Sequence, residues 1–304
     1  FSDAGRTYAQ VKDTADRIAN FLAGRGIRKG DRVAIFLPNL PHYPALYFGI
    51  LKAGAVTVTC NPLYTASELN HQLNDSGARA VFCMDHPVFY PTACEAVKNT
   101  LVETVVVCSV KSYLPPLKGF IGGLLGKIPK AASHDPSHLM FDQVVAAARP
   151  EPPKVDIDPA NDLALIIYTG GTTGVSKGAA LTHSNFLYDL MAIDEVGRFV
   201  HEPGKPPERM RRDGFHTYLG VLPFYHSFGM TVAMLSDCSI GARLICVPDP
   251  RAGNPPFTEV LKIVQKHRPT IMPAVPTLFV AFTNHPQIDQ YNLTSLIGCF
   301  SGGA

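Results

Sequence analysis

The chain of 304 residues carries 27 basic and 25 acidic side chains, so its formal net charge at pH 7 is only +2. This balance provides no basic field for nucleic acid, and we expect no nucleic-acid partner. Hydrophobic residues make up 46% and charged residues 17%, which excludes a coiled coil and a charged disordered chain and indicates a globular protein of roughly two domains.

The first 150 residues alternate helices with short apolar strands. Apolar residues at helical spacing after Thr7 predict a helix that ends near Gly24, and Thr65-Ala-Ser-Glu68 forms a capping box at the start of another helix. The other expected elements are strands at residues 32–37, 55–59, 80–83 and 104–108 and helices at residues 45–52 and 92–98. Strands that are apolar throughout predict a parallel sheet with helices on both faces, and therefore an α/β fold.

The segment 113–136 interrupts this alternation. Its centre is apolar and rich in glycine, and Lys118, Lys127 and Lys130 lie around it. Two interpretations remain open. The segment either lies in a membrane interface, as a peripheral contact on the inner face of the membrane, or forms a hydrophobic loop packed on its own domain.

A proline-rich connector at residues 150–159 precedes a second α/β region. The sequence therefore predicts two subdomains, residues 1–150 and residues 160–304. In the second, the expected elements are strands at residues 163–168, 217–222, 243–247, 270–272 and 296–300 and helices at residues 185–193, 229–236, 257–266 and 276–283.

The cysteines favour a reducing compartment. There are seven of them, none forms a C-x-x-C pair, and several lie in apolar runs such as residues 106–108, which is typical of buried thiols and argues against disulfides or a zinc site. No signal peptide is evident at Phe1, and no apolar run approaches the roughly 20 residues of a membrane span. We therefore expect a cytoplasmic protein.

The most informative stretch is Tyr168-Thr-Gly-Gly-Thr-Thr-Gly-Val-Ser-Lys-Gly178, which follows directly from an apolar strand. Glycines allow successive amides to point into one concavity, the hydroxyls add donors, and Lys177 supplies a full positive charge. A polyphosphate, whose oxygens are all acceptors, fits such a segment. The spacing matches neither a Walker A motif nor a Rossmann fingerprint.

A different enzyme class competes for the same residues. Gly174-Val-Ser176-Lys-Gly178 satisfies the G-x-S-x-G pattern of a serine hydrolase with Ser176 as nucleophile. A nucleophile elbow requires a tight turn from a strand into a helix, whereas several polar residues separate Tyr168 from Ser176. The residues after Gly178 also resemble a strand, which disfavours the hydrolase.

The glycine-rich stretch resembles the phosphate-binding signature of the adenylate-forming superfamily, which includes acyl- and aryl-CoA synthetases, luciferases and adenylation domains. Other motifs of that superfamily occur in the expected order across the chain, namely Leu51-Lys-Ala-Gly-Ala55, Asn61-Pro-Leu-Tyr64, Leu222-Pro-Phe-Tyr-His226-Ser-Phe-Gly229, Pro273-Ala-Val-Pro276 and Ser301-Gly-Gly-Ala304. The Asn61–Tyr64 motif with His71-Gln-Leu-Asn-Asp-Ser-Gly77, and the insertion at 113–136, look most like bacterial long-chain fatty acid–CoA ligases.

This resemblance implies two stacked βαβ-type subdomains with largely parallel sheets flanked by helices. It also implies that the small C-terminal domain of the superfamily lies beyond residue 304, so the chain is expected to be an N-terminal fragment. We accordingly expect weak or no complete ligase activity from these 304 residues alone.

The resemblance further implies the chemistry. A fatty acid would react with ATP, with Mg²⁺ present, to give acyl-AMP, and coenzyme A would then accept the acyl group. The implied catalytic residues are His226 and Lys177. The implied ATP-binding residues are Thr169, Gly170, Gly171, Thr172, Thr173, Gly174, Ser176, Lys177, Gly302, Gly303 and Ala304, with Thr169 also near the metal. The implied acyl-substrate residues are Phe224, Tyr225, His226 and Gly229.

Alternatives stay open within and beyond this family. The chain could belong to an aryl-acid CoA ligase or another adenylating enzyme, or act as a non-catalytic fatty-acid or nucleotide-binding module. Without the resemblance, the sequence favours a His226 packed between aromatic side chains in a core, and the resemblance reverses this preference. Acyl-chain preference and oligomeric state cannot be read from the sequence.

Overall fold

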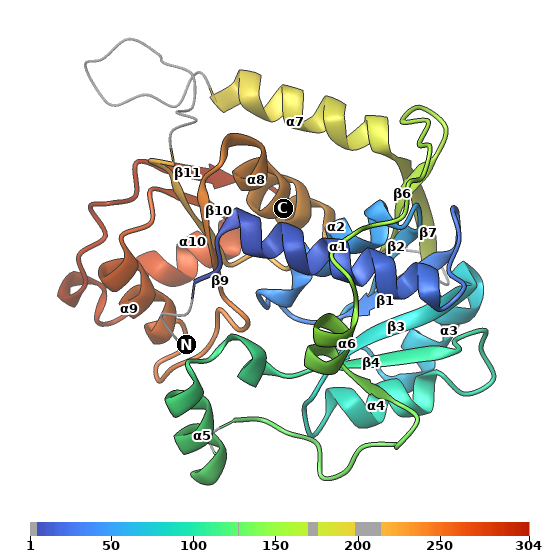
Figure 1. Cartoon of the computed structure of the whole chain (residues 1–304). Coiled ribbons are helices and arrows are strands. Elements are labelled where there is room, and N and C mark those ends of the chain that lie inside the picture. Colours follow the sequence, from blue (N-terminus) through green and yellow to red (C-terminus); the bar gives the residue numbers. More distant parts are fainter. Residues whose placement is uncertain (1–4, 127, 170–175, 198–213, 304) are drawn as a thin grey trace. The chain divides into compact units, whose positions relative to one another are not determined.

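A computed structural model describes residues 5–126, 128–169, 176–197 and 214–303. The chain forms two compact units (Figure 1). Unit 1 comprises Phe1–Leu37 and Pro41–His183, and unit 2 comprises Pro38–Leu40 and Ser184–Ala304. Three residues from the first part of the chain, 38–40, therefore belong to the second unit.

A seven-stranded sheet forms the core of unit 1. Its strands are β1 (Arg32–Phe36), β2 (Val56–Thr59), β3 (Ala78–Met84), β4 (Thr104–Cys108), β5 (Leu139–Met140), β6 (Leu163–Thr169) and β7 (Lys177–Thr182), in the order β5-β4-β3-β1-β2-β6-β7. Every pair of neighbours is parallel except β6 and β7. The largely parallel sheet expected from the apolar strands is confirmed.

The boundary between the units differs from the expected one. The sequence assigned the region after the proline-rich connector to the second subdomain, yet β6 and β7 complete the sheet of unit 1. The reason is that β6 is apolar on both faces and pairs in parallel with β2, for example Val58 with Ile166. The division consequently falls at His183 and not near residue 160.

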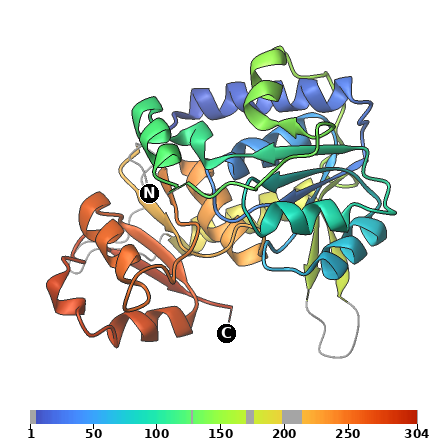
Figure 2. The same ribbon diagram turned by 90° about the horizontal axis from the view of Figure 1, so that it is seen from below.

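Helices cover both faces of this sheet. The helices of unit 1 are α1 (Tyr8–Gly24), α2 (His42–Lys52), α3 (Ala66–Ser76), α4 (Phe89–Ala96), α5 (Pro116–Leu124) and α6 (Phe141–Ala147), with a 3₁₀ turn η1 (Val110–Tyr113). Figure 2 shows α1 and α6 over one face and α3 and α4 over the other. The predicted capping box at α3 is confirmed, because the Thr65 hydroxyl accepts from the Glu68 amide and the Glu68 carboxylate accepts from the Thr65 amide.

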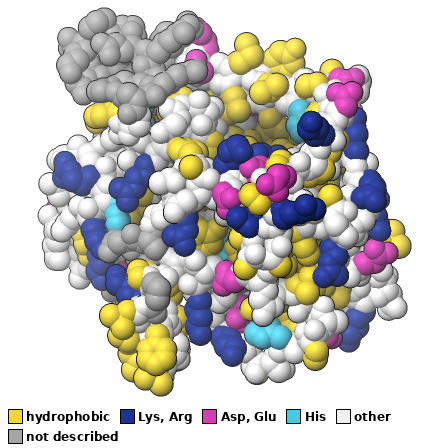
Figure 3. All heavy atoms as spheres, viewed as in Figure 1, with side chains coloured by type: hydrophobic (Ala, Val, Ile, Leu, Met, Phe, Trp, Pro, Cys, Tyr) yellow, Lys and Arg dark blue, Asp and Glu magenta, His cyan; other side chains and the backbone are white. Residues whose placement is uncertain are grey.

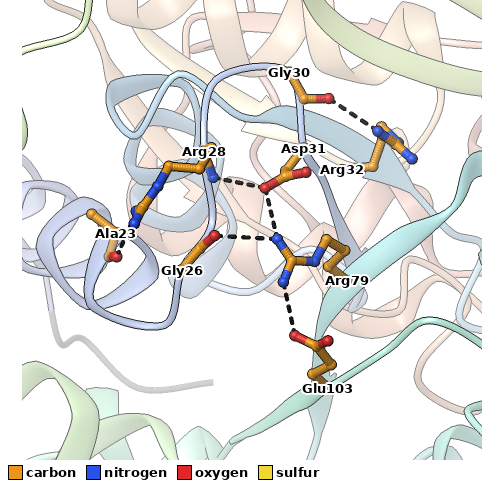
Figure 4. A network of polar contacts seen from close by, with 8 residues as sticks. All are labelled: Ala23, Gly26, Arg28, Gly30, Asp31, Arg32, Arg79 and Glu103. Carbon is orange, nitrogen blue, oxygen red and sulfur yellow. Dashed lines mark hydrogen bonds and ion pairs between the residues drawn. The ribbon is translucent and has the colours of Figure 1, made fainter.

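A network of polar side chains and backbone groups lies at the amino end of β1, β3 and β4 in this sheet (Figure 4). The Arg79 guanidinium, on β3, donates to Gly26 O at 3.1 Å, to Asp31 Oδ2 at 3.0 Å and to Glu103 Oε2 at 2.9 Å. Asp31 Oδ2 also accepts from the Arg28 amide at 2.7 Å. One side chain thereby connects the turn before β1 to the turn before β4.

Unit 2 contains a four-stranded parallel sheet in the order β11-β10-β8-β9. The strands are β8 (Thr217–Gly220), β9 (Arg243–Cys246), β10 (Ile271–Ala274) and β11 (Gly298–Ser301). The helical elements are α7 (His183–Gly197), the π-helical turn η2 (Gly229–Leu235), α8 (Ser236–Ile240), α9 (Thr258–His267), α10 (Pro276–Thr283) and the 3₁₀ turn η3 (Ile288–Gln290). Leu219, Val260 and Met272 are buried at its core.

The insertion at 113–136 forms a helix, α5, which differs from the hydrophobic loop considered as one alternative. Leu117, Phe120, Ile121 and Leu124 recur at i, i+3, i+4 and i+7, so they share one face of α5, and all four are exposed. In Figure 3 apolar side chains gather over α5. Among the described residues, no helix has the length and apolarity needed to span a membrane.

Candidate functional site

The glycine-rich segment connects two antiparallel strands. The register pairs Thr169, the last residue of β6, with Lys177, the first residue of β7, and both side chains are exposed at the end of the sheet. The Ser176 hydroxyl donates to the Thr169 carbonyl oxygen at 2.8 Å, which closes the base of the connection. The strands β6 and β7 therefore form a hairpin, and Thr169, Ser176 and Lys177 lie where the two strands meet the glycine-rich connection.

The structure describes only some of the residues that are expected to bind phosphate. Thr169, Ser176 and Lys177 occupy the hairpin base as just described. The other loop residues, Gly170, Gly171, Thr172, Thr173 and Gly174, lie outside the described residues, as does Ala304.

Tyr168 fixes the β6 side of the hairpin. Its ring is buried, and its hydroxyl donates to Asp75 Oδ2, on α3, at 2.5 Å. Burial and the adjacent Asp75 carboxylate both raise the pKa of Tyr168 well above its usual value, which keeps the phenol protonated as a donor. Gly178 lies opposite Tyr168, and a Cβ there would approach Ile166 Cγ2 to 2.7 Å and Tyr168 Cζ to 3.1 Å. A glycine at this position leaves room for the tyrosine ring.

Ser176 does not have the surroundings of a hydrolase nucleophile. The strand β7 follows it, as expected from the sequence, whereas a nucleophile elbow leads into a helix. Its hydroxyl is bonded to Thr169, and the nearby His71 Nε2 lies 3.4 Å from the Ser176 carbonyl oxygen, not from the hydroxyl. The serine-hydrolase alternative does not fit this geometry.

In unit 2, a buried amide shapes the turn that carries the aromatic and histidine residues. Asn39 donates through Nδ2 to the carbonyl oxygens of Gly220 at 3.0 Å and Leu222 at 2.7 Å, and its Oδ1 accepts from the Phe224 amide at 2.8 Å. The Phe224 ring is fully buried and packs where a Cβ on Gly220 would meet it at 3.0 Å. The structure thus gives Phe224 a packing role in this turn.

His226 is exposed, so the core-histidine interpretation is wrong. Its amide donates to Pro223 O at 3.1 Å, its ring lies 6.1 Å from the half-buried Tyr225 ring, and its carbonyl accepts from Met230. Gly229 begins the π-helical turn η2, and a Cβ there would lie 2.1 Å from Pro223 O. Only glycine permits this close approach, which presents His226 and Tyr225 at the end of the turn. A π-helical turn is frequent at functional sites.

Three motifs meet inside unit 2. A Cβ on Gly302 would lie 3.2 Å from the Phe228 ring, and one on Gly303 would lie 3.6 Å from the same ring and 3.8 Å from Val275. The Gly302 amide also donates to Ala274 O at 3.3 Å. The aromatic–histidine turn, the 273–276 segment and the Gly302-Gly303 backbone are therefore neighbours.

Sequence reasoning missed the side chains that hold these segments. Asp75 and His71 lie in a stretch, 71–77, that was singled out only as a resemblance, although their i, i+4 spacing places them on one face of α3. Asn39 carried no signal, because its partners lie more than 180 residues away in the chain.

A cavity of about 410 Å³ in unit 1 contains none of the expected residues. Tyr90, Cys94, Lys98, Ala131 and His134 are among the residues that line it. Burial raises the pKa of the Cys94 thiol, so the thiol is not activated as a nucleophile.

The residues present are compatible with Mg²⁺ held mainly by nucleotide phosphates. Thr169 offers one hydroxyl oxygen, a hard donor of the kind that Mg²⁺ prefers. No group of three or more His, Cys, Asp or Glu side chains suited to a metal ion exists among the described residues. A metal here would take most of its ligands from the substrate and from water.

The fold and the hairpin define an α/β protein in which the glycine-rich stretch connects the antiparallel strands β6 and β7. The chain belongs to the AMP-binding enzyme family, whose pattern matches residues 1–304. This match confirms the resemblance to adenylate-forming enzymes inferred from the motifs.

Characterised relatives are similar over nearly the whole chain. A long-chain-fatty-acid–CoA ligase of Bacillus subtilis (strain 168) is 33% identical over 310 residues, which cover 98% of this chain and 50% of the relative. The ligase of the same name from Salmonella typhimurium is 35% identical over 305 residues, covering 98% and 51%. The chain thus spans about half the length of these relatives.

The fold is also that of a solved structure, an anthranilate CoA ligase in complex with anthranoyl-AMP. The TM-score is 0.79 at 21% identity, covering 99% of this chain and 52% of that one. The expected α/β architecture of the adenylate-forming superfamily is therefore confirmed.

Proposed function

We propose that this chain supplies the ATP-binding and acid-activating residues of a ligase that converts a long-chain fatty acid to its coenzyme A thioester. The observation that carries the proposal is the hairpin whose register sets Lys177 beside Thr169 at the two ends of the glycine-rich connection. The identity of about a third to long-chain-fatty-acid–CoA ligases supports the substrate class.

The proposed reaction has two steps. A carboxylate oxygen attacks the α-phosphorus of ATP, the bond between the α-phosphorus and the bridging oxygen breaks, and pyrophosphate leaves. The coenzyme A thiolate then attacks the acyl carbon, a C–S bond forms, and AMP leaves. Both steps bring anions together, so preorganised donors and positive charge must offset the repulsion.

The residues divide by task. Lys177, Ser176 and the glycine-rich residues 170–174 would bind the β- and γ-phosphates, and Thr169 would provide a ligand to Mg²⁺. Mg²⁺, when bound, neutralises charge on the phosphate oxygens. His226 would orient the carboxylate, with Tyr225, Phe224 and Gly229 shaping the acyl site. Gly302, Gly303 and Ala304 would contact the adenine through their backbone.

Acid-dependent exchange of labelled pyrophosphate into ATP tests this function in the enzyme that contains this chain. We expect exchange with C12–C18 fatty acids and little with benzoate or anthranilate. Exchange restricted to the aromatic acids would replace the proposal with an aryl-acid ligase. ATP binding without exchange for any acid would replace it with a nucleotide-binding module.

We further propose that α5 inserts its exposed apolar face into an anionic bilayer, from which a fatty acid can be drawn. Leu117, Phe120 and Leu124 are 69%, 71% and 79% exposed, respectively, an unusual concentration on one short helix. Residues 110–133 contain four lysines and no acidic residue in a chain that is otherwise nearly balanced. Apolar and cationic side chains together match the interface of an anionic membrane.

The ends of this insertion are anchored in unit 1. The buried Tyr113 ring packs edge-on against His42 at 4.5 Å. On the other side, the buried Asp85 carboxylate accepts from the Ala131 amide at 2.8 Å and bonds His134 Nε2 at 2.9 Å. The insertion is therefore tethered to unit 1 at both ends, while the apolar face of α5 stays exposed.

Vesicle co-sedimentation tests the membrane surface. Phe120→Ser combined with Leu124→Ser is expected to reduce binding to phosphatidylglycerol vesicles about tenfold or more, because two exposed apolar side chains no longer insert. Leu101→Ser, which alters another exposed leucine of unit 1, is the matched control. Equal binding of all three proteins, or no binding by the parent, would contradict the proposal.

A further inference from the structure

The helix α3 holds both sides of the hairpin base. Asp75 bonds the Tyr168 hydroxyl on the β6 side, and His71 lies 3.4 Å from the Ser176 carbonyl oxygen on the β7 side. His71 and Asp75 are four residues apart, so they face the same way from α3. One face of one helix therefore contacts the residues at both ends of the glycine-rich connection.

We propose that Asp75 is a positioning residue for ATP: through Tyr168, it sets where the phosphate-binding connection begins. Tyr168 immediately precedes Thr169, whose carbonyl accepts from Ser176 and whose backbone pairs with Lys177. A shift of Tyr168 would consequently move the residues proposed to meet the phosphates. The inference rests on the proposed function and names a residue outside the hairpin.

Asp75 has no evident role in stabilising its own helix. It is the penultimate residue of α3, where the carbonyl end of the helix dipole disfavours a negative charge. The side chain is exposed apart from its contact with Tyr168. A residue that costs its helix some stability yet bonds the hairpin base fits a role in function better than a role in folding.

Enzyme kinetics in the ligase that contains this chain distinguish a role of Asp75 in ATP binding from a role in folding. Asp75→Ala is expected to raise KM for ATP in pyrophosphate exchange about tenfold, in line with losing a hydrogen bond to a charged group. KM for the fatty acid is expected to change less than about twofold. Asp75→Asn, which keeps an acceptor for the tyrosine hydroxyl, is expected to restore most of the ATP affinity.

Two further variants complete the design. Tyr168→Phe is expected to match Asp75→Ala, and the double variant is expected to be no worse than either single one, because both remove the same bond. Asn74→Ala, on the exposed side of the same helix, is the control for α3 and is expected to leave both KM values unchanged. Calorimetric titration with ATP provides a readout that does not depend on turnover.

The outcomes are distinct. If Asp75→Ala leaves KM for ATP unchanged, or raises both KM values together with a fall in Tm, Asp75 does not position the hairpin. If the parent enzyme shows no exchange with any acid, the proposed function fails, and the calorimetric affinity for ATP alone decides whether Asp75 positions the hairpin.

Discussion

The hairpin of unit 1 and the aromatic–histidine turn of unit 2 are both held by a polar side chain from a distant part of the chain, but the two anchors differ. Asn39 is 3% exposed and makes three hydrogen bonds, to Gly220, Leu222 and Phe224. Asp75 is exposed, and within the described part of the chain its side chain makes one hydrogen bond, to Tyr168. The first anchor is part of a core, whereas the second acts at a surface.

This difference separates two ways of holding a functional segment. A buried anchor cannot be removed without leaving polar backbone groups unsatisfied, so its loss affects folding first. An exposed anchor can be replaced by water at little cost to folding, so its loss affects the segment alone.

Asn39→Ala should produce the largest loss of stability. The Leu222 carbonyl oxygen and the Phe224 amide lose their partner, at about 1–3 kcal/mol each, and the Gly220 carbonyl oxygen keeps only the Val247 amide, so we expect a loss of about 3 kcal/mol or more in urea unfolding. Asn39→Asp keeps the acceptor for the Phe224 amide but sets a buried carboxylate against two carbonyl oxygens, and should lose at least as much stability as Asn39→Ala. If Asn39→Ala lowers the free energy of unfolding by less than about 1 kcal/mol, the buried Asn39 matters no more for folding than the exposed Asp75 is expected to.

Lys177→Ala should affect catalysis and leave folding unchanged. The exposed ammonium group makes no contribution to a core, while its proposed phosphate contact predicts a fall in pyrophosphate exchange of about 10²-fold or more, or about 2.7 kcal/mol. Lys154→Ala removes another exposed lysine of unit 1 and serves as the control. Full exchange in Lys177→Ala would place the phosphates away from this end of the hairpin.

The sequence predicts the elements well and the anchors poorly, for physical reasons. Apolar runs such as the one in β6 specify a buried parallel strand, and Thr65 with Glu68 specifies a helix start, because both signals are local. The pairing of β6 with β2 depends on partners about 100 residues apart, so the proline-rich connector suggested the wrong boundary.

The candidate functional site was also predictable only where its signal is local in the sequence. The residue types around Lys177 indicate phosphate binding because their chemistry is local to one loop. The contacts of Asn39 and Asp75 join residues 93 to 185 positions apart, and only the fold brings them together.

His42 is a third polar side chain to compare: it is buried, and neither ring nitrogen has a hydrogen-bond partner among the residues that the structure describes. Its ring packs edge-on against Tyr113 and Phe141, and burial lowers its pKa from 6.5 to about 3. The unfolded chain therefore binds a proton near pH 6.5 that the folded chain excludes. Stability should be fully present above pH 6.5 and fall by up to about 1.4 kcal/mol per unit as the pH drops toward 3.

The variant His42→Phe isolates this contribution. It retains an aromatic ring between Tyr113 and Phe141 but cannot titrate, so its stability should fall less steeply between pH 6.5 and 4 than that of the parent. Parallel stability curves for the two proteins over this range would show that His42 is not the source of the slope.

Arg79→Ala should have the smallest effect and none on ATP. The network that it would break is partly exposed and screened by solvent, so we expect only a small loss of stability in urea unfolding. The network lies at the amino end of β3 and shares no residue with the hairpin. A change in KM for ATP in this variant would show that stability alone governs the hairpin, against the distinction drawn above.

The most direct test of the central claim is a crystal structure of this chain with ATP and Mg²⁺. We expect the triphosphate to lie within hydrogen-bonding distance of the segment from Thr169 to Lys177, with the Lys177 ammonium group on a phosphate oxygen. A triphosphate bound elsewhere, with this segment making no contact to it, would show that the hairpin is not the phosphate site.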